Sequence, residues 1–230
     1  MIGGVPDRGE TPVASETVEN YLKAVYTLCG ESPAGEAGMS RIAALVGVTT
    51  GTATTMVKKL AASKLARYER FGGVRLTPKG ERAALDILRR HRIVETFLVQ
   101  TLKLDWSAVH AEAERLEHAI SPVVLEALDA HLGHPSIDPH GDPIPDALGK
   151  TRPSGGEPLS SFACGSKVRI VRILDQDSAF LSFVAKHGLK PGSVATIVSV
   201  EPTAQSIAVQ AKGQPSVSMA MTAAARIICE

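Results

Sequence analysis

Apolar residues recur every three or four positions through the first part of the chain, a spacing typical of amphipathic helices. The first helix is predicted to begin after Ser15, a candidate N-cap. Two shorter helices follow, the first capped by Ser40 and the second by Thr49 or Thr50, and the turn between them contains Gly47. Two short helices joined by such a turn indicate a helix-turn-helix.

A pair of short strands is predicted over residues 65–76, directly after these helices. Phe71, Gly72 and Gly73 form the tip, and we expect the glycines to take positive φ in the hairpin turn. A helix-turn-helix followed by a hairpin is a winged helix, and the hydroxyl side chains that open its second helix suit base edges and phosphates. The expected DNA contacts are Thr49, Thr50, Thr52, Thr54, Thr55, Lys58, Lys59, Arg70 and Arg75.

A longer helix is predicted to begin with Thr77 as its cap and Pro78 in its first turn, and to run to about Leu102. After a short break, Ser107 is expected to cap a further helix and Ser121 to begin the last one. The apolar residues of these helices exceed what one thin helical layer can bury. We interpret the excess as a homodimer interface, which also suits paired half-sites on double-stranded operator DNA.

The pattern changes after residue 160, where short runs of alternating apolar and polar residues are separated by turns. Five strands are predicted, with a helix inserted after the first, and they indicate an SH3-like small β-barrel. The fold class is therefore a mainly α N-terminal part, with a winged helix and a helical dimerization domain, and a C-terminal SH3-like barrel. The expected domains are a disordered tail (1–14), a winged helix-turn-helix DNA-binding domain (15–78), a helical metal-binding and dimerization domain (79–140), a linker (141–160) and the barrel (161–230).

Charge is distributed unevenly along the chain. The net charge is +1, but residues 39–92 hold twelve Lys or Arg and three acidic residues, a net charge of +9. This asymmetry indicates a polyanionic partner for the winged helix. The three cysteines are far apart and form no disulfide framework, and neither a signal peptide nor a membrane-spanning run is found. We therefore expect a cytoplasmic protein without membrane contact.

Side chains that can bind a metal are concentrated between residues 91 and 118. His91 and Glu95 are four residues apart, so they share one helix face. A second group falls within about 100° of arc on the following helix. Nitrogen and oxygen donors on successive helices suit one or two divalent transition metals. The second group consists of His110, Glu114, Glu117 and His118.

The residues alone leave other interpretations open. The acidic side chains could form a solvated face on which Glu114 and Glu117 pair with Arg115. A Pro- and Gly-rich stretch follows the helices, and histidines near its beginning could be ligands or ordinary surface residues. These histidines are His131, His134 and His140.

The order of these motifs resembles the diphtheria toxin repressor family of metal-dependent transcription regulators, in its three-domain form. The resemblance covers roughly residues 15–230, and its most specific part is H-x-x-x-E followed by H-x-x-x-E-x-x-E-H directly behind a winged helix. It implies a homodimer in which a divalent metal fixes two winged helices at the spacing of a palindromic operator, and control of manganese or iron homeostasis genes. Metal and DNA would then bind cooperatively.

The resemblance also implies two possible metal sites per subunit. The first would contain His91, Glu95 and His110. It would be completed by side chains of the barrel, for which Asp175, Gln176 and Asp177 are the candidates. The second would contain Glu114, Glu117, His118 and, from the first helix, Asn20.

Two positions bear on the choice of metal. In iron-type members a cysteine stands where this chain has Glu114, and a carboxylate oxygen suits Mn²⁺. Asn20 departs from both types, and Lys23 stands where manganese-type members have a carboxylate. We expect Mn²⁺ as the cofactor, with Fe²⁺ as the alternative.

Two other functions compete with a metal-dependent regulator. Carboxylates and histidines on paired helices also build di-metal enzyme sites. The chain has no nucleophile motif and no glycine-rich nucleotide loop, so we expect that it is not an enzyme. A winged-helix dimer that binds DNA without metal is the other alternative, and in that case the histidines would be structural.

Overall fold

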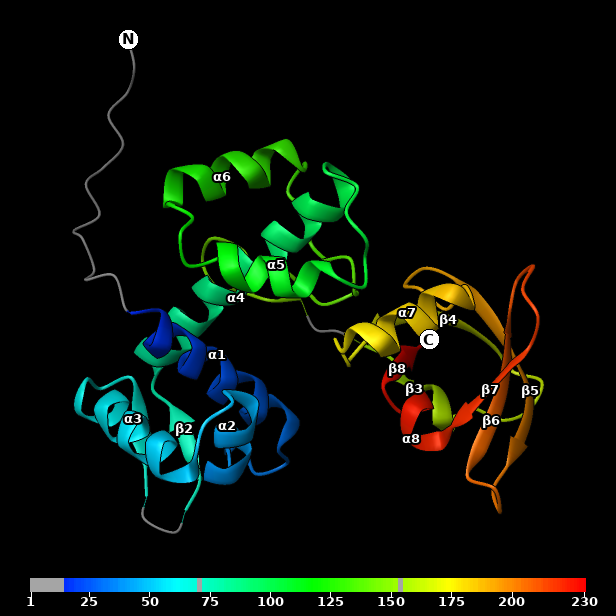
Figure 1. The fold of residues 1–230 in the computed structure, drawn as a ribbon, viewed down its shortest axis with the longest axis horizontal. Helices are drawn as coiled ribbons and strands as arrows, with labels where there is room; N and C mark the ends of the chain where they lie inside the picture. Colours follow the sequence, from blue (N-terminus) through cyan, green and yellow to red (C-terminus); the bar gives the residue numbers. More distant parts are fainter. Residues whose placement is uncertain (1–14, 70–71, 153–154) are drawn as a thin grey trace. The chain divides into compact units, whose positions relative to one another are not determined.

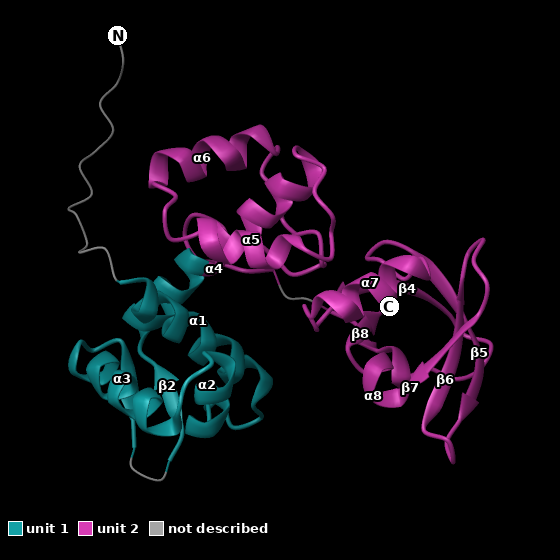
Figure 2. Cartoon of the chain, in the orientation of Figure 1, with its two compact units in different colours: residues 1–87 teal, residues 88–230 magenta. Residues whose placement is uncertain are grey.

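The computed structural model describes residues 15–69, 72–152 and 155–230 (Figure 1). The chain divides into two compact units, residues 1–87 and 88–230 (Figure 2). The tail predicted over 1–14, Arg70 and the wing residue Phe71 lie outside the described residues. Within the described part, no helix is both long enough and apolar enough to cross a bilayer.

The first unit is a winged helix. Its apolar core is shared by its helices and strands, with Leu22, Ile42 and Val57 fully buried. Thr49 is the N-cap of the third helix, as predicted, and its hydroxyl accepts a hydrogen bond from the Thr52 amide. The elements are α1 (Glu16–Glu31), α2 (Met39–Leu45), α3 (Thr50–Ala62), β1 (Ala66–Tyr68), β2 (Val74–Leu76) and the beginning of α4 (Pro78–Gln100).

Two local predictions for this unit are wrong. Helix α2 begins at Met39 after Gly38, so Ser40 lies inside the helix and does not cap it. Neither Gly72 nor Gly73 takes positive φ. Glycine is required at position 73 for lack of space, because a Cβ there would lie 2.4 Å from the Cβ of Glu36.

The second unit opens with the rest of α4, followed by α5 (Val109–Leu116) and α6 (Pro122–His131). Val94 of α4 packs with Val109, and Ile93 packs with Leu125. Ser121 caps α6 as predicted. The Ser107 cap is wrong, since Ser107 donates to the Asp105 carboxylate and α5 begins two residues later.

The C-terminal part of this unit is the predicted barrel-like β structure (Figure 1). All strand pairs are antiparallel, in the order β3-β8-β4-β5-β6-β7. Ile170, Ile197 and Ile207 are fully buried in its core. The elements are β3 (Glu157–Pro158), η1 (Leu159–Ser161), β4 (Lys167–Ile173), α7 (Ser178–Lys186), β5 (Val194–Glu201), β6 (Ser206–Ala211), β7 (Val217–Ala220), α8 (Met221–Ala224) and β8 (Ile227–Cys229).

The segment expected to be a linker begins with residues that belong to the packed structure. Asp142 and Ile144 are buried, and Ile144 lies in the same apolar cluster as Ile93. The Ile137–Pro143 bridge closes this loop. Burial of the loop is explained by its contacts with α4 and β4, which the Pro- and Gly-rich composition does not reveal.

Candidate metal centre

Helix α4 contributes a histidine and a glutamate, one turn apart, to a buried cluster. His91 is 4% exposed and Glu95 is fully buried. Nε2 of His91 lies 3.0 Å from Oε1 of Glu95. Placing two polar groups in the interior is costly unless both are partnered, and the partners come from the next helix and from a loop.

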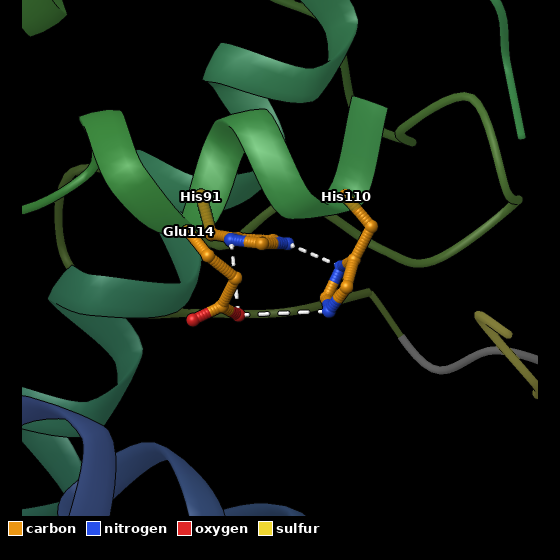
Figure 3. Close-up of side chains that lie close together, drawn as sticks. All are labelled: His91, His110 and Glu114. Atoms are coloured by element: carbon orange, nitrogen blue, oxygen red, sulfur yellow. Dashed lines mark hydrogen bonds and ion pairs between the residues drawn. The ribbon is translucent and has the colours of Figure 1, made fainter. Parts of the chain in front are cut away.

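Helix α5 supplies His110 and Glu114, which face His91 (Figure 3). Nδ1 of His110 lies 3.1 Å from Nε2 of His91 and 3.1 Å from Oε1 of Glu95. Oε1 of Glu114 lies 3.7 Å from Nδ1 of His91 and 3.6 Å from Nε2 of His110. Two imidazoles and one carboxylate therefore surround one point.

Glu117 and His118 lie just beyond the end of α5, where the chain turns. Glu117 is buried, and its carboxylate makes a short contact with Nδ1 of His91. Nε2 of His118 lies 3.6 Å from the other oxygen of Glu117. His91 therefore contacts residues that the sequence assigned to two separate sites, and the structure joins both sets into one cluster.

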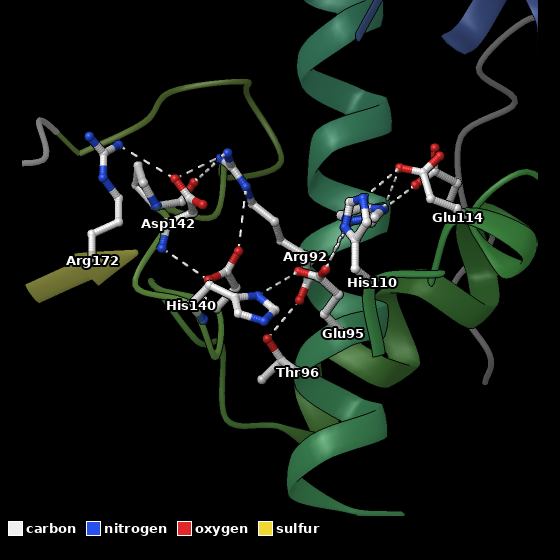
Figure 4. A network of polar contacts seen from close by, with 12 residues as sticks. Arg92, Glu95, Thr96, His110, Glu114, His140, Asp142 and Arg172 are labelled. Atoms are coloured by element: carbon white, nitrogen blue, oxygen red, sulfur yellow. Dashed lines mark hydrogen bonds and ion pairs between the residues drawn. The ribbon is translucent and has the colours of Figure 1, made fainter. Parts of the chain in front are cut away.

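A second donor set lies on the other side of Glu95 (Figure 4). It is formed by Glu95 with two loop residues. Oε2 of Glu95 lies 3.6 Å from Nδ1 of His140, which is fully buried. Asp138 completes this set. The sequence left His140 open as a ligand and missed Asp138, because nothing in the local pattern shows that the loop folds onto α4.

Three atoms of this second set have no hydrogen-bond partner among the described residues: Oε2 of Glu95, Oδ2 of Asp138 and Nδ1 of His140. Nε2 of His140 faces the carbonyl oxygen of Trp106 at 3.2 Å, which favours the proton on that nitrogen. The inward-facing atoms are then all acceptors. Arg92 of α4 lies 3.6 Å from Oδ2 of Asp138 but does not hydrogen-bond to it. A cation between the three atoms would satisfy all of them, so the donor set fits a divalent metal.

Burial and close neighbours also shift the pKa values of the carboxylates in the second set. Burial raises the pKa of Glu95, but the charge of His91 and hydrogen bonds from the surrounding histidines outweigh it and hold this pKa well below its usual range. Burial, together with the charges of Asp142 and Glu95, raises the pKa of Asp138 to about 7. Burial and neighbouring charges therefore shift the pKa values of these two carboxylates in opposite directions.

Other expected ligands are placed elsewhere. The Asp175 carboxylate pairs with Arg226, and Asp177 is the N-cap of α7, so neither lies in the clusters found among the described residues. Gln176 is half-buried beside them. Asn20 belongs to α1 in the first unit, where its side-chain oxygen has no hydrogen-bond partner among the described residues.

Most of the expected DNA contacts lie on α3 or directly before it, with the threonines at its beginning and the two lysines in its C-terminal half. The exposed ones are Thr49, Thr50, Thr52, Thr55, Lys58, Lys59 and, in the wing, Arg75. Thr54 is half-buried and donates to the Thr50 carbonyl, so its hydroxyl is engaged within the helix. Arg75 pairs with Glu36 at 2.9 Å and also donates to the Ala34 carbonyl, contacts that tie the wing to the preceding loop.

Three family models match successive parts of the chain. They are described as "Iron dependent repressor, N-terminal DNA binding domain" (residues 14–74), "Iron dependent repressor, metal binding and dimerisation domain" (77–146) and "FeoA domain" (157–230). Together they cover both donor sets and α3. The predicted fold class, a mainly α N-terminal part followed by a small SH3-like β domain, is thereby confirmed.

Relatives and solved structures agree with this assignment. The iron-dependent repressor IdeR of Mycobacterium leprae is 33% identical over 158 residues, which span 69% of this chain and 66% of that protein. The diphtheria toxin repressor of Corynebacterium efficiens is 28% identical over 194 residues, 80% of this chain and 84% of that protein. A manganese-dependent transcriptional repressor solved in complex with manganese is 36% identical, with a TM-score of 0.85, and the match covers 92% of this chain and 98% of that one. The chain therefore belongs to the iron-dependent repressor family, whose members are metal-dependent transcriptional repressors and not enzymes.

Proposed function

We propose that this protein is a cytoplasmic, metal-dependent transcriptional repressor that binds palindromic operator DNA as a homodimer. Mn²⁺ is the preferred metal and Fe²⁺ the alternative, and the controlled genes serve manganese or iron homeostasis. The observation that carries the proposal is the cluster of nitrogen and oxygen donors on α4 and α5, in which His91 and Glu95 are buried and His110 and Glu114 are half-buried. The same α4 begins directly behind the wing.

The residues that would hold metal fall into two sets. Glu95 belongs to the second set and contacts the histidines of the first. His91, His110 and Glu114 form one, with Glu117 and His118 next to it. Glu95, Asp138 and His140 form the other. Asn20, Asp175 and Gln176 stay predicted ligands. A bound divalent cation would supply the positive charge that pairs with these acceptor atoms.

The chemistry of the donors supports Mn²⁺. Both clusters offer only imidazole nitrogens and carboxylate oxygens, and neither contains a thiolate. Hard oxygen donors suit Mn²⁺, whereas a cysteine in place of Glu114 would favour softer metals. Fe²⁺ accepts the same donors, which makes it the alternative metal.

The test is an operator-fragment binding titration at fixed salt with chelator-stripped protein. Samples would contain Mn²⁺, Fe²⁺ under anaerobic conditions, Zn²⁺ or no metal. We expect tight binding only with metal, at the lowest concentration for Mn²⁺. Equal binding without metal would refute the proposal and favour the metal-independent dimer, and a tighter response to Fe²⁺ would assign the chain to the iron-dependent alternative.

A double variant tests the donor assignment. Glu114→Ala with His118→Ala is expected to abolish the metal dependence of DNA binding. Glu112→Ala is the matched control, because Glu112 lies on the same helix but pairs with Arg115 at the surface. If the double variant responded to metal as the control does, the assignment of these ligands would be wrong.

A further inference from the structure

The loop from Asp138 to Asp142 lies between helix α4 and strand β4. Its central residue, His140, contacts α4 through its side chain and β4 through its backbone. The side chain points to Glu95, with Nδ1 3.6 Å from Oε2, while the backbone carbonyl accepts a hydrogen bond of 2.9 Å from the amide of Ile173 in β4. One residue thus joins the donor set of α4 to the sheet of the barrel (Figure 4).

The next residue fixes how closely the loop approaches the sheet. Gly141 has φ +90°, and a Cβ built on it would lie 2.0 Å from the carbonyl oxygen of Val171. No larger residue fits without separating the loop from β4. The approach is also held by Asp142, which pairs with Arg172 of β4 at 3.4 Å and with Arg92 of α4 at 3.6 Å.

Trp106, the single tryptophan of the chain, holds the same loop from the connection between α4 and α5. It is 7% exposed and belongs to the apolar core of the barrel. Its indole N–H donates to the Pro139 carbonyl at 2.7 Å, and its own carbonyl oxygen lies 3.2 Å from Nε2 of His140. His140 therefore cannot shift toward Glu95 without disturbing Trp106 or Ile173.

We infer that metal binding to the Glu95, Asp138 and His140 set is coupled, through the loop from Asp138 to Asp142, to the packing of the barrel against that loop. The inference rests on the proposed function, since it needs these residues to bind metal. Coupling between two equilibria is reciprocal. Metal binding therefore stabilises the contact between His140 and β4, and loosening that contact weakens metal binding by the same factor. The barrel acts as a regulator of metal affinity without itself having to supply the ligand.

Gly141→Ala tests the coupling without altering any donor. Its matched control is Gly133→Ala, because Gly133 has a similar positive φ of +73° but nothing within 4 Å of the added Cβ. In calorimetric Mn²⁺ titrations of the full chain, we expect one binding event to be weakened about tenfold in Gly141→Ala and by less than about twofold in Gly133→Ala. Equal titrations of the two variants would overturn the inference.

Two further measurements test the coupling even if Gly141→Ala fails to fold. In the unaltered protein, Mn²⁺ should slow hydrogen exchange at the Ile173 amide, followed by mass spectrometry of peptides from β4. Trp106→Phe, which keeps a ring but loses the N–H donor to Pro139, should reduce that slowing. If Mn²⁺ binds and β4 exchanges unchanged, the coupling is refuted while the proposed function stands. If the unaltered protein binds neither Mn²⁺ nor, under anaerobic conditions, Fe²⁺, both are refuted.

Discussion

Nε2 of His91 lies 3.0 Å from Oε1 of Glu95, one turn further along the buried face of α4. The other oxygen of Glu95 faces His140, so this carboxylate belongs to the second donor set and also contacts both histidines of the first. A single substitution at this position should therefore affect both.

Glu95→Gln removes the charge and one oxygen while keeping the side-chain shape. We expect Mn²⁺ affinity to fall about tenfold or more, because even the loss of a residue that only supports a ligand costs about that much. Calorimetry on chelator-stripped protein measures it. Glu112→Gln, at the exposed surface of α5, serves as the control and should bind Mn²⁺ normally. Unchanged affinity in Glu95→Gln would exclude this carboxylate as a ligand.

The lysines of α3 provide a prediction about DNA. Lys58 and Lys59 are exposed at the C-terminal half of the helix, where they can reach phosphates. Replacing both by alanine should weaken binding to all sequences and lower the slope of log affinity against log salt by about 1 for each lost phosphate contact. Lys186→Ala, in the barrel helix α7, should leave the slope unchanged. A sequence-specific loss with an unaltered slope would contradict the assignment.

The exposed apolar residues of α6 predict where the subunits meet. Val123 is 80% exposed and Val124 is 48% exposed, on a helix within the part that matches a dimerisation domain. Val123→Asp should shift the protein from dimer to monomer in sedimentation experiments, because an unpaired charge is costly in an interface. Leu148→Asp, at a loop position where the side chain is 67% exposed, is the control. A dimer in both variants would place the interface elsewhere.

Gly80 tests the packing of the winged helix. A Cβ at this position would lie 1.9 Å from the Leu65 carbonyl oxygen, so Gly80→Ala should lower the free energy of unfolding by about 1–3 kcal/mol. Gly51→Ala in α3 meets nothing closer than 3.8 Å and should raise that energy by up to about 1 kcal/mol, since alanine favours the helix. Thermal unfolding compares the two. Equal stability of both variants would show that the chain accommodates the added methyl group.

The helices and the first donors could be predicted from sequence because their signals are local. Thr49, Thr77 and Ser121 act as predicted at helix beginnings, where a hydroxyl accepts a backbone N–H. The i, i+4 spacing of His91 and Glu95 places them on one face by helix geometry alone. The predictions that failed, at Ser40, Gly72, Gly73 and Ser107, depend on single backbone angles and on neighbours remote in sequence.

The sequence by itself determined the winged helix, the helices that follow it, the small β domain and their order, together with most of the side chains that meet in the donor clusters of α4 and α5. Periodicity and capping encode these features within a few residues. Only the tertiary structure decided that Asp138 and His140 join Glu95, that Asp175 pairs with Arg226, and that Arg75 pairs with Glu36. These contacts join residues 39 to 51 positions apart, or a loop to a helix, and no local pattern records which distant surfaces bury one another.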